Sequence, residues 1–252
     1  MQPEIIGQGT SNRPSLPNHA GEFTKGHDSY PLDPVDSRSV DYYTGVRQDV
    51  VAMIPEGVNS ILEVGCAAGG TGRLLRSMGF RKIIGIELNP HYALLAREHY
   101  SRIIVGDAEE IDLHEIEDHA LDCILYPDVL EHFRDPWAVL RRHLRVLKPH
   151  GYVVASIPNI RYYKAVQDLV WRGKWEYADA GILDRGHLRF FTLKSIQALF
   201  ADNGLCVLKW NQRGRGSHFL KLLNKVLLNR LSPFLVKQYL VLAQKDGSGS
   251  LL

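Results

Sequence analysis

Short apolar runs separated by longer helix-like stretches organise most of this 252-residue chain. Such runs are typical of buried strands when turn-forming residues bound them. Between them, apolar residues recur every three or four positions, as one face of a helix requires. This alternation predicts a parallel, doubly wound α/β sheet with helices on both faces. The predicted strands are Ile61–Val64, Ile83–Ile86, Ile103–Val105, Leu121–Tyr126, Tyr152–Ile157, Leu205–Trp210 and Tyr239–Ala243.

The same spacing places the helices. One apolar face predicts a helix that stops before Pro55 and leads into the first strand; its members are Tyr43, Val46, Val50 and Met53. Asp135 is typical of an N-cap because a proline follows it. The helix it begins presents Trp137, Leu140, Leu144 and Leu147 on one face, and the segment 148–151 is expected to end it. Two further helices are predicted, over Leu193–Asn203 with Thr192 as its cap, and from about His218 to Leu231.

The two ends of the chain differ from its middle. Residues 1–38 contain Pro3, Pro14, Pro17, Pro31 and Pro34 among Gly, Ser and Asn, with no sustained apolar period. We therefore expect a flexible N-terminal arm. Residues 39–246 are expected to form one domain, because 45% hydrophobic residues in a chain of this length supply one substantial core. Residues 247–252 are expected to be a disordered tail.

The amino-acid composition argues against several classes of protein and does not by itself indicate a function. The net charge of +2 is too small to imply a partner by itself. The three cysteines, Cys66, Cys123 and Cys206, are odd in number and far apart, which argues against a disulfide framework and a thiolate metal cluster. The chain shows neither a signal peptide nor an apolar run near the roughly 20 residues of a membrane span. We therefore expect a cytoplasmic protein.

A glycine-rich turn after the first strand is the strongest chemical signal. It runs from Gly65 to Gly72 and leads into a helix-like segment. Gly65 and Gly69 let the backbone pass close to a ligand, and the helix start presents free N–H groups to it. The turn predicts a nucleoside-cofactor site, with a purely structural strand-to-helix turn as the alternative.

Position 67 separates two kinds of nucleoside-binding turn. A dinucleotide fingerprint, G-x-G-x-x-G from Gly65, would need glycine there, and the residue is Ala67. Instead the carboxylate of Glu63 stands two residues before the first glycine, where it suits a cationic ligand and would repel a pyrophosphate. The pattern resembles motif I of the class I methyltransferases that use S-adenosylmethionine. The resemblance implies that the methionine and ribose portions of this cofactor are held by Glu63, Gly65, Cys66, Ala67 and Gly69.

Acids after the next two strands fit the same cofactor. In an open α/β sheet the ligand lies beyond the carboxyl ends of the strands, where the strand order reverses. The resemblance gives Glu87 the ribose hydroxyls and Leu88 a place near the adenine. It gives Asp107, beside Ala108, the adenine amino group. The other acids between positions 107 and 118 are expected to form a solvated face.

The segment after the fourth strand strengthens the resemblance. It contains Asp128-Val-Leu-Glu131-His132, similar to the D-V-L-E-H motif of a broad group that includes ubiquinone O-methyltransferases. Asp128 would complete the cofactor pocket. The resemblance covers about residues 40–245 and implies a Rossmann-like sheet of seven mostly parallel strands, the last antiparallel. Two departures, Ala67 and His150 in place of glycines, lie at the edges of turns.

Two histidines are candidates for acid–base chemistry. A hydroxyl acceptor must lose its proton as it attacks the methyl group, and imidazole is a suitable base. His132 follows the fourth strand. His187 belongs to a stretch similar to the H-x-R-F-F-T motif of a subgroup associated with glycan and natural-product methylation. His187 is the leading candidate, and a loop-anchoring role is its alternative.

A metal site is a further hypothesis for the same residues. Spacing of i, i+3 and i+4 puts Asp128, Glu131 and His132 on one face of a helical turn, and His187 would add a second imidazole. Ubiquinone O-methyltransferases and small-RNA 2′-O-methyltransferases use a similar arrangement to bind a divalent ion. In many relatives the motif holds only the cofactor and the substrate loop, so the sequence favours no metal.

The acceptor side is less defined. Between the fifth strand and the His187 stretch, where this family inserts a substrate cover, the region of about 160–190 carries Tyr162, Tyr163, Trp171, Trp175 and Tyr177. These aromatics are candidates for stacking on an acceptor ring or for a small core of the cover itself.

The region 217–236 combines an apolar face with basic residues. Contact with a membrane surface or a lipid-linked acceptor is one interpretation. The sequence favours the other, a helix packed between the last two strands with solvated lysines. No nucleic-acid partner is expected, since no RNA-binding module is present.

Two classes of function follow from these patterns. The first is an S-adenosylmethionine-dependent enzyme that O-methylates a hydroxyl of a small molecule, sugar or glycan precursor, with a ubiquinone-type phenol as the alternative acceptor. The second is a partner protein that binds the cofactor without turnover. The complete set of strand-end acids favours the enzyme. A nicotinamide-dependent dehydrogenase is a distant third.

Overall fold

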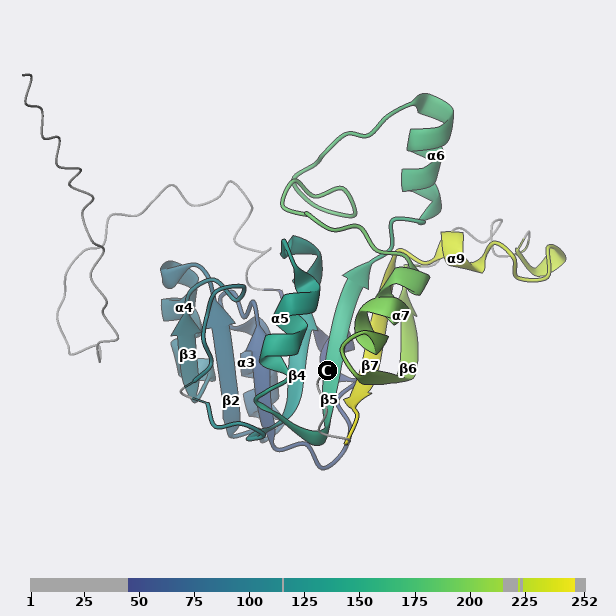
Figure 1. Cartoon of the computed structure of the whole chain (residues 1–252). Coiled ribbons are helices and arrows are strands. Elements are labelled where there is room, and N and C mark those ends of the chain that lie inside the picture. The colour runs from purple at the N-terminus through teal and green to yellow at the C-terminus, as the bar shows by residue number, and fades with distance from the viewer. Residues whose placement is uncertain (1–44, 115, 215–221, 223, 248–252) are drawn as a thin grey trace, which may run out of the picture. The chain divides into compact units, whose positions relative to one another are not determined.

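The computed structural model describes residues 45–114, 116–214, 222 and 224–247, so the predicted N-terminal arm and all but the first residue of the predicted tail lie outside the described residues. One seven-stranded sheet forms the centre of the domain, in the order β3-β2-β1-β4-β5-β7-β6 (Figure 1). The predicted α/β fold is confirmed. The strands are β1 Ser60–Val64, β2 Lys82–Glu87, β3 Arg102–Val105, β4 Leu121–Pro127, β5 Leu147–Pro158, β6 Leu205–Arg213 and β7 Gln238–Lys245.

The pairing directions agree with the prediction. Strands β3, β2, β1, β4 and β5 pair in parallel, and β7 lies antiparallel between β5 and β6. The chain runs outward from β1 to β3 and then returns to β4 on the other side of β1. The strand order therefore reverses between β1 and β4, where an open sheet of this kind binds its ligand.

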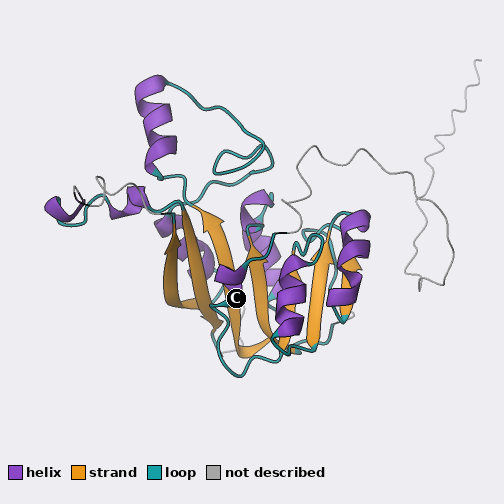
Figure 2. Cartoon of the chain, turned by 180° about the vertical axis from the view of Figure 1, so that it is seen from behind, coloured by secondary structure: helices purple, strands orange, loops and turns teal. Residues whose placement is uncertain are grey.

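Alternation along the strands builds two cores, one on each face of the sheet. In β1, Leu62 and Val64 join the core that α5 and α7 cover, whereas Ile61 joins the core beneath α2, α3 and α4. Successive strand residues point to opposite faces, so a fully buried strand such as β1 serves both. The two helical layers are seen from opposite sides in Figures 1 and 2.

Two helices begin at the caps that the sequence predicts. The Asp135 side chain accepts a hydrogen bond from the Ala138 backbone at 3.0 Å, and Thr192 forms a capping box with Ser195. The helical elements are α2 Gln48–Val51, α3 Gly70–Ser77, α4 Pro90–Ala96, η1 Arg97–His99, η2 Leu130–His132, α5 Pro136–His143, α6 Tyr163–Arg172, α7 Leu193–Ala201 and α9 Ser232–Leu235.

Three predicted helix boundaries are wrong. The helix before β1 is a single turn, Gln48–Val51, because the chain turns away to deliver β1. The helix from Asp135 ends at His143, and Leu147, assigned to its apolar face, pairs with Leu121 in the sheet instead. The segment 148–151 is thus part of β5. Helix α7 ends at Ala201 rather than at Asn203, whose side-chain amide bonds the Leu199 carbonyl at 2.8 Å.

The predicted helix at 218–231 lies partly outside the described residues. Leu222 and residues 224–226 are helical, but Leu228 and Asn229 have φ of 51° and 63°, a left-handed conformation that ends the helix before Leu231. Val226 and Leu228 are exposed, so the favoured interpretation of a packed helix does not hold for the described part. None of the helices in the described part of the chain combines the length and apolar character that a membrane span needs.

Candidate active site at the carboxyl edge of the sheet

The glycine turn links β1 to α3 with a tight backbone path. Gly69 is the N-cap of α3 at φ of 85°, and a Cβ there would lie 2.9 Å from the Ala96 backbone. Only glycine suits such a left-handed position with so close a neighbour. Ala67 also adopts a left-handed φ, 46°, which a glycine would take with less strain. The turn therefore accommodates Ala67, in place of the commoner glycine, in a left-handed conformation.

Glu63 is buried under this turn. Its carboxylate, 2% exposed, accepts a hydrogen bond from the Tyr100 hydroxyl at 2.6 Å. Burial raises the pKa of Glu63 to about 7, because the charged form loses its hydration. A cationic ligand in contact with this carboxylate would favour the ionised form.

Glu87 supports the turn from the end of β2. One carboxylate oxygen accepts from the Ala67 backbone N–H at 2.8 Å and the other from the Asn89 N–H at 2.9 Å. Burial raises the pKa of Glu87, against the effect of these hydrogen bonds. The neighbouring Leu88 is 67% exposed and forms part of the rim.

The loop after β3 is held from below by a buried histidine. Asp107 accepts from the Glu109 N–H at 2.8 Å. The His143 ring lies between the Ala108 carbonyl, 3.2 Å from Nε2, and the Tyr126 hydroxyl, 3.0 Å from Nδ1. Burial lowers the pKa of His143 to about 4, so the neutral ring donates to Ala108 and accepts from Tyr126. The sequence analysis missed His143, because its helical spacing marks it only as one more helix residue.

These residues surround one cavity of about 440 Å³. Of the ten residues predicted to bind the cofactor, all but Gly69 line it; Gly69 instead packs against α4. The lining includes Glu63, Gly65, Cys66, Ala67, Glu87, Leu88, Asp107, Ala108 and Asp128. The cavity thus lies at the reversal of strand order and brings together acids from three strand ends and from the turn after β4.

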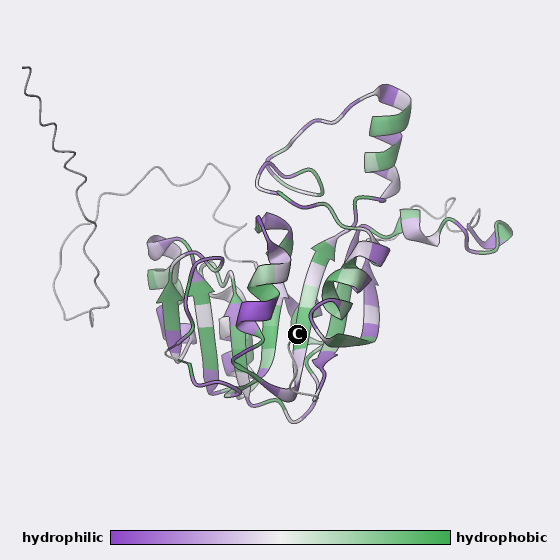
Figure 3. Cartoon of the chain, viewed as in Figure 1, coloured by the Kyte–Doolittle hydropathy of each residue, from purple (hydrophilic) through white to green (hydrophobic). Residues whose placement is uncertain are grey.

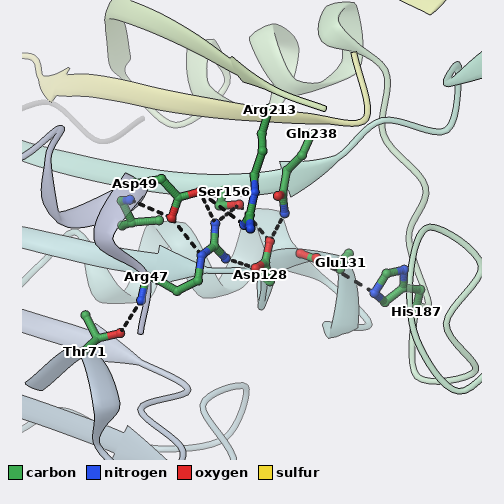
Figure 4. A network of polar contacts seen from close by, with 10 residues as sticks. Arg47, Asp49, Thr71, Asp128, Glu131, Ser156, His187, Arg213 and Gln238 are labelled. Carbon is green, nitrogen blue, oxygen red and sulfur yellow. Dashed lines mark hydrogen bonds and ion pairs between the residues drawn. The ribbon is translucent and has the colours of Figure 1, made fainter. Parts of the chain in front are cut away.

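Arg47 adds a cation to this cavity. Its guanidinium contacts Asp49 at 3.0 and 3.2 Å, the Ser156 hydroxyl at 2.9 Å and the Asp128 carboxylate (Figure 4). The Arg47 backbone N–H also donates to the Thr71 hydroxyl at 3.3 Å. Sequence reasoning missed Arg47, although a lone cation in the segment that enters the first strand was a weak signal for it.

Asp128 is oriented by this network. It has a left-handed φ of 55°, accepts from the Ser156 hydroxyl at 2.7 Å and from the Gln238 amide, and pairs with Arg47. Its carboxylate therefore does not join the group of metal-ligand atoms that converge nearby. Of the four residues predicted as possible metal ligands, Asp128 is therefore excluded and three remain.

Those three residues are Glu131, His132 and His187. One ligand atom of each lies within 4.8 Å of the others, and His187 Nε2 is 3.9 Å from a Glu131 oxygen (Figure 4). Nδ1 of His187 lies 2.9 Å from the Ile182 carbonyl and Nδ1 of His132 lies 2.9 Å from the Gly186 carbonyl. Each ring therefore donates from Nδ1 and directs Nε2 to its other side.

Glu131 is the most unusual member of this cluster. It is 1% exposed, and neither carboxylate oxygen has a hydrogen-bond partner among the described residues. Burial raises the pKa of Glu131 to about 8. A buried carboxyl group whose oxygens accept no hydrogen bond is rare, and such a group is a candidate for a functional role.

A second cavity, of about 130 Å³, adjoins the first. It shares Asp128 and His132 with the larger cavity, and His187 and Asp184 also line it. The five aromatic residues proposed from the sequence as an acceptor platform are not among its described lining residues. Trp175 instead packs edge-on against Phe190, with ring centroids 5.3 Å apart. The cluster of Glu131, His132 and His187 thus lies between the two cavities.

The chain is similar in sequence to known methyltransferases. Residues 42–209 match the model of a methyltransferase domain family. The chain is 30% identical over 145 residues to a ubiquinone biosynthesis O-methyltransferase of Neisseria meningitidis, over 56% of each chain. It is 27% identical to one from Hydrogenovibrio crunogenus, over 75% of this chain and 76% of the relative. The chain thus spans just over half the length of the Neisseria relative.

A solved structure shares the fold. A SAM-dependent methyltransferase from Archaeoglobus fulgidus superposes with a TM-score of 0.61 at 17% identity, over 81% of this chain and 97% of that one. The family match covers the glycine turn, the strand-end acids and strands β1 to β5, which place them around one cavity. This chain therefore belongs to the class I methyltransferases that use S-adenosylmethionine.

Proposed function

We propose that this methyltransferase transfers the methyl group to a hydroxyl oxygen of a small molecule, a sugar or a glycan precursor. The observation that carries the proposal is the cluster of Glu131, His132 and His187 between the two cavities. A hydroxyl must lose its proton as it attacks, and an imidazole is a suitable acceptor near neutral pH. Proton-accepting groups at this junction support oxygen as the atom that is methylated.

In this proposal the larger cavity holds the methyl donor. Glu63 faces its ammonium group and Arg47 its carboxylate, since Glu63 is the most buried carboxylate and Arg47 the one arginine among the described lining residues. Glu87 accepts from the ribose hydroxyls, and Asp107 with Ala108 contacts the adenine. When bound, the donor supplies a methyl group on a positively charged sulfur, so the main task of the protein is alignment.

The acceptor hydroxyl enters from the smaller cavity. As the oxygen–carbon bond forms, the sulfur–carbon bond breaks and its electron pair stays on sulfur. The hydroxyl proton passes to Nε2 of His187, because Nδ1 already donates to the Ile182 carbonyl. Glu131 lies 3.9 Å away, and its ionised form stabilises the imidazolium that results. His132, which lines both cavities, is the second candidate base.

A divalent cation at the same cluster is the second candidate, and it is favoured because the Glu131 oxygens accept no hydrogen bond from the described residues. Two imidazoles with their Nδ1 atoms bonded to backbone carbonyls, together with one carboxylate, form a donor set that suits zinc, manganese or iron. Glu131, His132 and His187 would hold the ion. It would lower the pKa of the acceptor hydroxyl and so reduce the need for a base.

The acceptor is tested with labelled S-adenosylmethionine and a panel of sugar nucleotides, lipid-linked sugars and phenols. Phenols are included because both relatives are named as ubiquinone biosynthesis O-methyltransferases. The expected product is an ether that resists mild base. Methyl transfer confined to nitrogen, carbon or carboxyl acceptors would contradict the proposal.

The metal is tested separately. Metal content is measured on the purified protein and on Glu131→Gln, with the exposed Glu110→Gln as the matched control. A bound divalent ion that Glu131→Gln alone removes, and activity lost on chelation and restored by one ion, are the expected results for metal assistance. Full activity after chelation leaves His187 as the base.

We also propose a cytoplasmic location, supported by the three free thiols.

A further inference from the structure

Two segments far apart in the sequence expose apolar side chains near one end of the sheet. Helix α6 buries none of its residues, and Trp171 is 81% exposed. The second segment consists of Leu222 and residues 224–235, and in it Val226 is 71% and Leu228 83% exposed. Figure 3 shows apolar colour on both segments, which project from the body of the sheet. Exposed apolar groups gathered in this way mark an interaction surface.

The bases of the two segments are bonded to each other. The Asn159 side-chain amide, fully buried, donates to the Pro233 and Val236 carbonyls, each at 2.8 Å. The Arg161 guanidinium lies 4.5 Å from the centroid of the Phe234 ring. These contacts join the chain just before α6 to α9, so the two exposed segments extend from one place in the fold. Together we call them the α6–α9 surface.

The α6–α9 surface lies beside the smaller cavity. Pro158, which precedes Asn159, lines that cavity, and so do Lys237 and Gln238, which follow α9. Whatever the surface contacts is therefore close to the opening proposed for the acceptor. No step of methyl transfer requires α6 or Leu228, so these exposed residues call for a separate explanation.

The charge of this surface is positive. The stretch from Leu205 to Lys245 contains no Asp or Glu. Its described exposed cations include Lys225, Arg230 and Lys237. Around α6, four cations, Arg161, Lys164, Arg172 and Lys174, stand against two acids, Asp168 and Glu176. Aliphatic side chains, tryptophan and basic residues together are typical of helices that lie in the headgroup region of an anionic membrane.

Charge and polarity distinguish the candidate occupants. A second copy of the chain seated on the same surface would bring like charges together. A nucleic acid would neutralise the cations but leave Trp171, Val226 and Leu228 in water. An anionic bilayer satisfies both groups, since its headgroups attract the cations and its acyl boundary takes the apolar side chains. We propose that the α6–α9 surface docks this methyltransferase on anionic membranes.

The test is co-sedimentation of the full chain with vesicles. One set contains phosphatidylcholine alone and the other phosphatidylcholine with phosphatidylglycerol. Binding is expected only to the anionic set, and it should weaken as salt is raised. Trp171→Ser and Leu228→Ser should each reduce binding severalfold. Leu94→Ser is the matched control, because Leu94 is 67% exposed on α4, outside the surface, and should change nothing.

The charge contribution has its own variant. Lys225→Gln combined with Arg230→Gln should reduce binding to anionic vesicles, whereas Arg81→Gln combined with Arg97→Gln should not. Each variant is first checked for the wild-type circular dichroism spectrum and melting temperature. The proposal is overturned if the wild type does not bind anionic vesicles, or if the surface variants and the controls bind equally. Self-association or RNA binding that the surface variants abolish, without vesicle binding, would also overturn it.

Discussion

The cavity formed at the ends of β1, β2 and β3 and the α6–α9 surface are built in opposite ways. Around the cavity, Glu63 and Glu87 are buried and accept hydrogen bonds from Tyr100, Ala67 and Asn89. Strands β1 and β2 beneath them are buried on both faces. Helix α6, by contrast, buries none of its residues. The first region is preorganised for one ligand, whereas the second is open.

The difference between the two regions indicates where specificity for the donor and specificity for the acceptor are located. In the proposed function, cofactor recognition depends on groups whose positions the sheet fixes. On the proposed acceptor side, the cluster of Glu131, His132 and His187 lies between the larger cavity and the α6–α9 surface. Substitutions should therefore separate binding of the donor from turnover of the acceptor.

The largest effect is expected at His187. His187→Ala should lower kcat by about 10²–10⁴-fold if the residue is the general base. Binding of S-adenosylmethionine, measured by calorimetry, should stay unchanged, because His187 lines only the smaller cavity. His91→Ala, an exposed histidine on α4, is the matched control. If His187→Ala also weakened the binding of S-adenosylmethionine, donor binding and acceptor turnover would not be separable at this residue.

Glu87 tests the preorganised side. Glu87→Ala removes the predicted acceptor of the ribose hydroxyls and two hydrogen bonds that hold Ala67 and Asn89. The dissociation constant of S-adenosylmethionine should rise about 10–100-fold, in line with charge-assisted hydrogen bonds. The comparison is with Glu98→Ala, an exposed acid on η1. Unchanged donor affinity in Glu87→Ala would show that the carboxylate supports only the turn.

Glu63 adds a pH dependence to the same cavity. Burial raises its pKa to about 7, so the carboxylate of the empty site becomes protonated as the pH falls below that value. A cationic donor prefers the ionised form, and its affinity should therefore fall by up to about tenfold per pH unit below the pKa. Calorimetric titrations between about pH 7.5 and 5.5 measure this slope. Glu63→Gln should bind weakly with a flatter profile; a wild-type profile already flat would exclude this role.

The strand-end acids could be predicted from the sequence because strand ends are visible in it. Glu63, Glu87 and Asp107 each follow an apolar run, and parallel strands bring their carboxyl ends to one edge. Arg47 and His143 were missed because they act across the fold. Arg47 reaches Asp128 and His143 reaches Ala108, contacts that no local spacing encodes.

The lining of the smaller cavity could not be predicted from the sequence for the same physical reason. The aromatic residues in the region of about 160–190 have no periodic pattern that assigns them to one side, and the smaller cavity is lined instead by residues such as Asp184 and Gln238. The apolar spacing at Leu144 and Leu147 shows the related limit. The helical spacing of apolar residues continues from α5 to Leu147. Leu147 is nevertheless part of a strand, because it pairs with β4.

The smallest effect is expected for the free energy of unfolding when an exposed residue of α6 is replaced. Trp171→Ala should change the free energy of unfolding by less than about 0.5 kcal/mol, because the side chain is 81% exposed and leaves no cavity. Leu75→Ala, fully buried beneath the cofactor side, should cost about 2–5 kcal/mol. Urea denaturation of both variants measures the contrast. If Trp171→Ala instead lowers stability by more than about 1 kcal/mol, α6 packs against the body in solution. The α6–α9 surface would then be a closed cover, and its apolar residues would need no membrane to explain them.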